Sequence, residues 1–222
     1  FGPTVALQGT IKADNKDAFI KNIKVKIIKL KNEEKHEFDW IAFRPLQINF
    51  GNNIELGLPL SFLLTTKQPE RFNIVFADYK TKDEIMLSVK RCDDEAWIVA
   101  KEFPQELLDG RIQADVISLK NQHVERYHNL ITQSNPFEML TKNMYWEAGE
   151  YELMAIINTE KYSFRQQYKF ILTKENYDSL KLNVSVIIEN PILVYLKKQL
   201  WQFHFVYTNY IEMNKEKKQI QS

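Results

Sequence analysis

The sequence predicts a mainly β protein, an antiparallel β-sandwich of about seven to ten strands. Apolar residues occupy every second position in several short runs, including Leu58–Leu64, Phe72–Phe76 and Tyr151–Ile157. Such runs recur about every 8 to 15 residues with turn-forming residues between them, which is typical of sandwiches. No helical spacing of apolar residues is apparent before residue 95, so a doubly wound α/β fold is not expected.

The first half of the chain is predicted to consist of strands. Alternation of apolar and polar side chains places one face of each strand in a core. Within the second strand the apolar positions change parity after Ile27, which indicates a β-bulge or a strand that passes from one sheet to another. The predicted strands are Val5–Ile11, Ile23–Leu30, His36–Phe43, Leu46–Phe50, Leu58–Leu64, Phe72–Phe76 and Ile85–Val89.

The middle of the chain, at about residues 95–145, is predicted to be a partly helical insertion. Phe103–Leu108 precedes Gly110, a pattern typical of a short helix with a glycine stop. Ser134–Pro136 predicts a second helix start, whereas Ile112–Ser118 alternates like a strand.

The last third begins with two predicted strands, Tyr151–Ile157 and Phe164–Leu172. Residues 174–187 have a helical spacing of apolar side chains, although the β-branched residues in this segment also allow a strand; we favour the helix. Pro191 is expected to end this helix, because the residue before a proline avoids the helical region. Residues 200–211 are aromatic and β-prone, and a polar tail from about residue 214 is expected to fray.

The strand pattern defines the predicted domains. Residues 1–173 form the sandwich domain with its insertion, and residues 174–222 form a C-terminal extension that packs on it. The predicted core consists of inward-facing strand positions. These are Ile23, Val25, Trp40, Leu60, Phe62, Phe72, Ile74, Phe76, Tyr151, Leu153, Phe170 and Leu172.

Composition limits the possible functions. The 222 residues have a net charge of +1 and 44% hydrophobic residues, which excludes disorder for most of the chain and gives no overall attraction to nucleic acid. Cys92 is the only cysteine in the sequence, so an intrachain disulfide and a cysteine-rich zinc site are excluded. No apolar run reaches the roughly 18 to 20 residues that cross a bilayer.

The chain starts at Phe1 rather than at Met, so we expect a fragment or a processed form. Its location is then expected to be the cytoplasm, or a membrane to which a missing upstream segment tethers it.

Trp146–Leu153 resembles an element of immunoglobulin-like modules in which a Gly or Ala two residues before a Tyr opens a strand at a tyrosine corner. In that corner the hydroxyl of the tyrosine, here Tyr151, binds nearby backbone. Leu7–Thr10 and Ile20–Lys26 resemble the first two strands of arrestin-like sandwiches, and of uncharacterised bacterial proteins that join such a sandwich to an upstream membrane anchor. The resemblance covers roughly residues 4–50 and 145–173 and implies binding or scaffolding, with no catalytic residue.

Motifs for catalysis and metal binding are few. The six glycines form neither a dinucleotide-binding fingerprint nor a P-loop, and there is no nucleophile elbow. His123, Glu125 and His128 form the only histidine cluster in the sequence. On a loop they could converge on zinc, whereas on a helix residues five apart do not share a face.

Lysines and tryptophans supply the candidate contact residues. A lysine-rich stretch could contact an anionic membrane surface, or could simply protect an exposed strand from aggregation. Its residues are Lys21, Lys24, Lys26, Lys29 and Lys31. Trp97, Trp146 and Trp201 are candidate platforms for stacking on sugars, with core packing as the alternative.

These observations favour a non-enzymatic interaction or scaffolding module that is the soluble part of a larger or membrane-tethered bacterial protein. A protein partner is expected, and neither a cofactor nor a nucleic-acid partner is. The alternative is a β-sandwich that binds carbohydrate or another ligand, with hydrolysis of that ligand as a further option.

Overall fold

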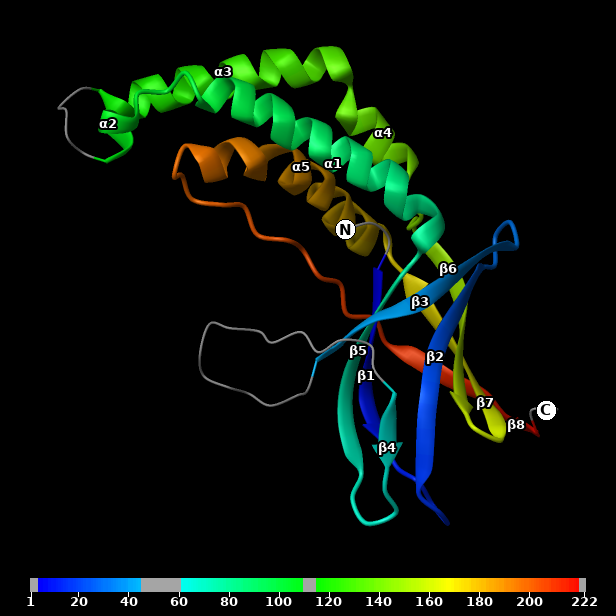
Figure 1. Ribbon diagram of the computed structural model, residues 1–222. Coiled ribbons are helices and arrows are strands. Elements are labelled where there is room, and N and C mark those ends of the chain that lie inside the picture. The colour runs from blue at the N-terminus through cyan, green and yellow to red at the C-terminus, as the bar shows by residue number, and fades with distance from the viewer. Residues whose placement is uncertain (1–3, 45–60, 110–114, 220–222) are drawn as a thin grey trace. The chain divides into compact units, whose positions relative to one another are not determined.

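The computed structural model describes residues 4–44, 61–109 and 115–219. The chain divides into two compact units, a sheet unit and a helical unit (Figure 1). The helical unit takes Thr81–Trp146 and Glu175–Tyr207, and the sheet unit takes the segments on either side of these. Each unit is therefore assembled from segments that lie far apart in the sequence.

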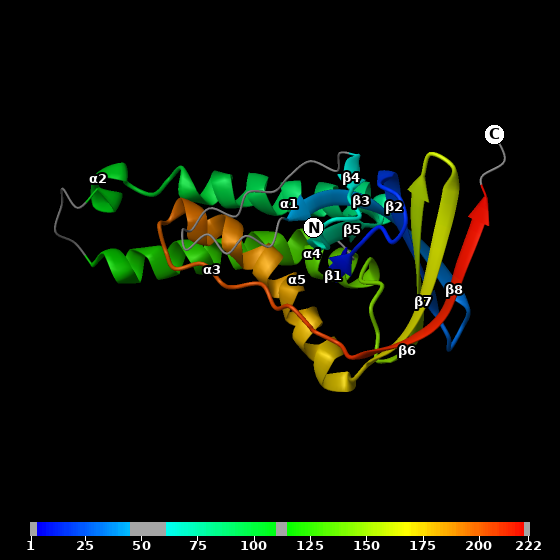
Figure 2. The same ribbon diagram turned by 90° about the horizontal axis from the view of Figure 1, so that it is seen from below.

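Antiparallel strands of the described residues form one eight-stranded sheet. Its order is β1-β5-β3-β2-β6-β7-β8, and β4 pairs with the start of β2. The strands are β1 Thr4–Ile11, β2 Ala18–Lys29, β3 Glu34–Arg44, β4 Phe62–Leu64, β5 Glu70–Ala77, β6 Gly149–Thr159, β7 Tyr162–Leu172 and β8 Tyr210–Gln219. The prediction of a mainly antiparallel β fold is confirmed. A sandwich of two facing sheets is not confirmed, because the sheet is open and curled (Figures 1 and 2).

Register shifts interrupt three of the strand pairs, and one lies in β2 where it meets β6, between Ile20 and Asn22. Such bulges bend a strand and increase its twist, which favours curling. The bulge or change of sheet predicted after Ile27 is wrong, because the register with β6 is unbroken from Asn22 to Lys29. Ile27 and Lys29 consequently face the same, buried side of the sheet.

The curl gives the sheet an apolar interior. Side chains from β1, β2, β4, β5 and β6 together line a cavity of about 30 Å³, so β1 and β5 face β2 and β6 across this interior. Its lining residues are Leu7, Ile11, Ile23, Phe62, Ile74, Phe76 and Ile157.

Most of the predicted core is confirmed in this interior. Phe62 and Phe170 are only half-buried, and the side chains of Leu60 and Phe72 lie outside the described residues. The confirmed buried residues are Ile23, Val25, Trp40, Ile74, Phe76, Tyr151, Leu153 and Leu172.

Tyr151 is fully buried near the start of β6. Its hydroxyl accepts a hydrogen bond from the N–H of Glu147 (2.9 Å) and donates one to the carbonyl of the same residue (2.8 Å). Its ring stacks on Phe170 with 5.2 Å between centroids. This is the backbone contact that the resemblance to a tyrosine corner implied. Burial raises the pKa of Tyr151, so the hydroxyl remains a donor at neutral pH.

The described residues contain five helices (Figure 2). They are α1 Tyr79–Ala100, α2 Gln105–Leu108, α3 Val116–Ser134, α4 Pro136–Lys142 and α5 Lys174–Tyr195. None of them combines the length and the apolar character needed to span a membrane. The short helix after Pro104 and the helix start at Ser134–Pro136 were predicted correctly, and Asn135 caps α4 by accepting from the N–H of Glu138 (3.4 Å).

All five helices contribute to the core of the helical unit, and most of its residues belong to α1 and α5. Along α1 its members recur three, four or seven residues apart, as Ile85, Cys92, Ala96 and Val99, the spacing of one helix face. The predicted strand Ile85–Val89 is therefore wrong. The alternation was misleading because Leu87 points to solvent and is 65% exposed.

Other boundaries also differ from the predictions. The strand predicted over residues 112–118 is wrong in its described part, because Val116 begins α3. The helix predicted from residue 174 is confirmed, but it continues through Pro191 to Tyr195. The polar tail forms strand β8 as far as Gln219. The predicted strand Leu46–Phe50 lies outside the described residues.

Candidate interaction surface

The segment that follows α5 carries a run of exposed apolar side chains. After α5 ends, the chain reverses and runs back alongside that helix (Figures 1 and 2). We call residues Leu200–Tyr207 the aromatic segment. Every second residue from Trp201 to Tyr207 is aromatic, and Phe205 and Tyr207 are 74% and 82% exposed.

Two asparagines of α5 hold the backbone of this segment. Asn183 donates to the carbonyl of His204 (2.9 Å) and accepts from its N–H (2.7 Å). Asn190 makes the same pair of bonds with Trp201, at 3.1 and 2.9 Å. Each amide thus satisfies both backbone polar groups of one residue, because its NH2 donates to the carbonyl and its oxygen accepts from the N–H.

The spacing of the two asparagines matches the spacing of their partners. Seven residues of α-helix advance about 10.5 Å and return to almost the same face. Three residues of extended chain, from Trp201 to His204, span about 9–10 Å. The two asparagines therefore bind the backbone of an extended segment and not its side chains. We call this pair on α5 the asparagine ladder.

We expect the double variant Asn183→Ala, Asn190→Ala to release the aromatic segment. Hydrogen–deuterium exchange of the Trp201 and His204 amides should accelerate at least tenfold, and the free energy of unfolding should fall by about 1–2 kcal/mol, since these bonds are exposed to solvent. Asn129→Ala, at an exposed position on α3, is the matched control and should change neither quantity. Unchanged amide exchange in the double variant would show that the ladder does not hold the segment.

The three candidate tryptophans occupy different environments. Trp97 lies on α1, is 54% exposed and contacts the ring of Tyr195 (5.5 Å between centroids). Trp146 is half-buried against Tyr145. Trp201 belongs to the aromatic segment. Within the described residues, Trp97 and Trp146 therefore contact different tyrosines, and Trp201 is held on α5 through its backbone.

The lysine-rich stretch does not form a single cationic face. Lys24 and Lys26 project from the outer side of β2, but Lys24 lies 3.5 Å from Asp39 and Lys26 pairs with Glu37 on β3. Lys29 faces the interior. Lys21 and Lys31 are exposed at the two ends of the stretch. Acidic partners therefore offset much of the charge that was expected to attract an anionic surface.

The histidine cluster lies on α3, where its members diverge. His123 bonds the carbonyl of Leu119 (2.9 Å), and His128 pairs with Glu189 of α5 (2.8 Å). Glu125 is exposed to solvent. In the part of the chain that the structure describes, no three His, Cys, Asp or Glu side chains form a group that could hold a metal ion.

Sequence reasoning missed an ion-pair network at one end of the sheet. The buried Lys29 ammonium lies 2.7 Å from Glu147 and 4.0 Å from Glu34. His36 connects Glu34 (3.0 Å) with the buried Asp78 (2.7 Å). The hydrogen bond from His36 lowers the pKa of Glu34 below its ordinary 4.5. Glu34 therefore contributes stability at pH values above 4.5, and this contribution is lost as the pH falls below it.

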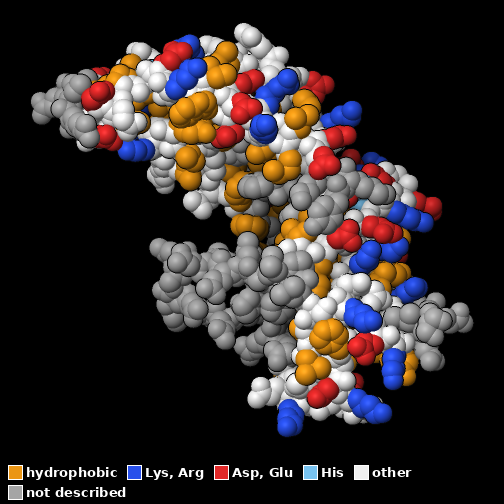
Figure 3. All heavy atoms as spheres, in the orientation of Figure 1, with side chains coloured by type: hydrophobic (Ala, Val, Ile, Leu, Met, Phe, Trp, Pro, Cys, Tyr) orange, Lys and Arg blue, Asp and Glu red, His pale blue; other side chains and the backbone are white. Residues whose placement is uncertain are grey.

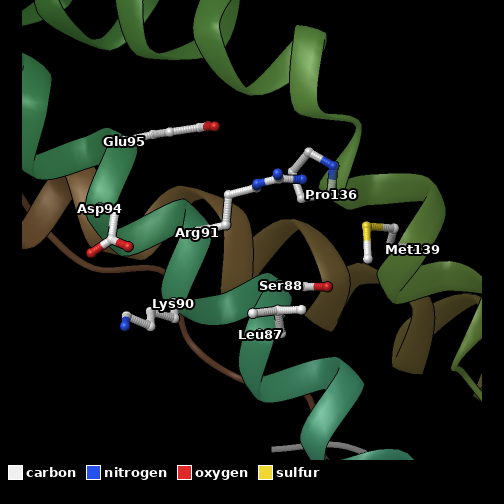
Figure 4. A pocket seen from close by; sticks show the side chains of 8 residues that line it. All are labelled: Leu87, Ser88, Lys90, Arg91, Asp94, Glu95, Pro136 and Met139. Carbon is white, nitrogen blue, oxygen red and sulfur yellow. The ribbon is translucent and has the colours of Figure 1, made fainter.

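A surface hollow of about 390 Å³ lies between α1 and α4 (Figure 4). Its walls carry charges of both signs, with Lys90 and Arg91 close in sequence to Asp94 and Glu95. Arg91 extends toward Pro136 across this hollow (Figure 4). Because the charges of its walls balance, the hollow favours no ligand charge.

Cys92 lies in the core of the helical unit. It is fully buried beside Tyr127, and burial raises the pKa of its thiol from 9.0 to about 11. The folded state therefore favours the protonated thiol, and the stability linked to this is present below pH 9 and lost as the pH rises through 11.

We accordingly expect native Cys92 to be inert. At pH 8 an aromatic disulfide reagent should label it at least about a hundredfold more slowly than the urea-unfolded chain, because labelling requires opening of the core. Labelling at similar rates in the two states would contradict this burial.

Comparisons with protein-family models, with curated proteins and with solved structures find no match to this chain.

Proposed function

We propose that this protein is a non-enzymatic interaction module whose contact surface is the aromatic segment. The observation that carries the proposal is the combination of exposed aromatic side chains with a backbone fixed by the asparagine ladder. Apolar side chains at the surface of the helical unit are visible in Figure 3. Contiguous exposed apolar residues mark interaction sites, and a backbone already ordered loses less entropy on binding.

The test is site-specific photo-cross-linking in cells that produce the full chain naturally. Benzoylphenylalanine placed at Phe205 should give a discrete adduct, whereas the same group at Ile117, an equally exposed position on α3, should give none. Adducts at neither position, or equally at both, would overturn the proposal.

We also propose that the module belongs to a larger or membrane-tethered protein. This is what its resemblance to uncharacterised bacterial proteins that join an arrestin-like sandwich to an upstream membrane anchor implies. Fractionation of cells that express the native gene tests this. Retention in a salt-washed membrane pellet supports a tether, and a fully soluble protein argues against one.

A second candidate function is carbohydrate binding at Trp97. Its exposed ring lies beside Tyr195, whose hydroxyl bonds Asp93 at 3.1 Å, so a stacking face adjoins a carboxylate. A sugar can stack on such a ring and donate hydrogen bonds from its hydroxyls to the carboxylate. A glycan array should then show binding that Trp97→Ala abolishes and Trp146→Ala preserves. An array without signal would dismiss this candidate.

A further inference from the structure

We propose that the C-terminal tail, residues 200–219, exchanges between two copies of this chain, so that the aromatic segment of one copy occupies the asparagine ladder of the other. The proposal concerns the backbone edge of the segment that faces α5. It is independent of the proposed function, which uses the aromatic side chains.

The first argument is the hinge at the end of α5. The N–H of Lys197 bonds the carbonyl of Val194 (3.1 Å), and the N–H of Lys198 bonds the carbonyl of Leu193 (2.9 Å). This is the pattern of a Schellman motif, in which the residue at the position of Lys197 adopts a left-handed conformation. Glycine usually occupies that position, whereas here Lys197 has a φ of 50°. A side chain in this region is strained, and straightening the hinge relieves the strain in both copies.

The second argument is the nature of the contacts that the tail makes. In the helical unit Asn183 and Asn190 bind only backbone atoms of the segment, and β8 is joined to β7 by an antiparallel backbone ladder. A second copy offers the same groups at the same spacing. Exchange therefore restores each of these bonds in trans, and the strained hinge favours the open form.

A complementation experiment tests the exchange with the full chain. Asn183→Ala removes the amide from the ladder. His204→Pro removes the N–H that donates a hydrogen bond to the Oδ1 of this amide. Neither variant alone can form both bonds of this contact, but a mixed dimer restores both of them once, between Asn183 of one copy and His204 of the other. Native mass spectrometry of ¹⁵N-labelled and unlabelled copies at high concentration should show the mixed dimer about tenfold above its statistical proportion.

A mixture of labelled and unlabelled Asn183→Ala copies is the control and should give the statistical proportion. Statistical mixing of the complementary pair would overturn the proposal, and so would the absence of any dimer in the wild type. Dimers that form without this preference would indicate an ordinary surface contact.

Variants of the hinge give an independent readout. Lys197→Gly relieves the strain in the monomer and should weaken dimerisation. The association constant of the dimer should fall about tenfold or more, since two hinges contribute. Lys197→Ala is the matched control, because it loses the contact with Asp109 as the glycine variant does but keeps the Cβ; its dimerisation should be unchanged. Lys198→Pro should raise dimerisation, because proline deletes the bond to Leu193 and moves Lys197 toward an extended conformation. Equal behaviour of the three variants would exclude the hinge as the cause.

Discussion

Replacing Tyr127 with Ala is expected to lower the free energy of unfolding by about 4 kcal/mol, as for other large-to-small changes of buried aromatic residues. Tyr127 is fully buried at the centre of the helical core, where α3 meets α5. Its hydroxyl donates to the carbonyl of Ile188 at 2.6 Å, and burial raises its pKa, so this donor is kept at high pH. Urea unfolding followed by circular dichroism measures the loss.

Two further variants separate the contributions to this loss. Tyr127→Phe keeps the ring and removes the hydroxyl, so it should cost about 1–2 kcal/mol. Tyr207→Ala removes the same side chain where it is 82% exposed, and should change stability by less than about 0.5 kcal/mol. A loss below about 1 kcal/mol for Tyr127→Ala would mean that neighbouring side chains repack into the cavity that the ring leaves.

The half-buried strands were the most predictable part of the fold. Ile23, Val25 and Ile27 alternate with exposed residues because one face of β2 packs into the sheet interior and the other faces solvent. The order of the strands was not predictable, because β8 pairs with β7 and β1 with β5 across long stretches of chain. A local pattern identifies a strand but contains no information on its neighbours.

Helix α1 was missed because its buried face is weakly apolar. Cys92 and Ala96 are small residues within a charged sequence, while Ile85, Leu87 and Val89 alternate as in a strand. Pro191 was expected to end α5, but the helix continues to Tyr195. A proline removes one hydrogen bond of the helix. Several residues of α5 between Val184 and Leu193 are buried, so packing stabilises the helix beyond this loss.

The asparagine ladder was only partly predictable. Residues seven apart on a predicted helix share a face, so Asn183 and Asn190 could have been recognised as a pair. The position of the aromatic segment beside α5 depends on the chain reversal at Lys197, for which the sequence offers no glycine signal.

Removing Glu147 is expected to be more costly than removing the lysine that it neutralises. Lys29 is 4% exposed on the inner face of β2, and Glu147 is its closest partner at 2.7 Å. Glu147→Ala leaves a buried ammonium with Glu34 at 4.0 Å, and should cost about 2 kcal/mol, less than for a fully buried pair because Glu147 is half-exposed. Urea unfolding of the two variants side by side measures the difference.

Lys29→Met should change stability by less than about 1 kcal/mol, because methionine fills a similar volume without a charge to desolvate. Both glutamates then remain hydrated at the surface. The exposed pair of Lys26 with Glu37 supplies the matched control, and Glu37→Ala should cost less than about 0.5 kcal/mol. If Lys29→Met proves as destabilising as Glu147→Ala, the ion pair itself stabilises the sheet. If only Glu147→Ala is destabilising, the cost arises from the unpaired buried charge, and the lysine is tolerated in the interior only because Glu147 lies beside it.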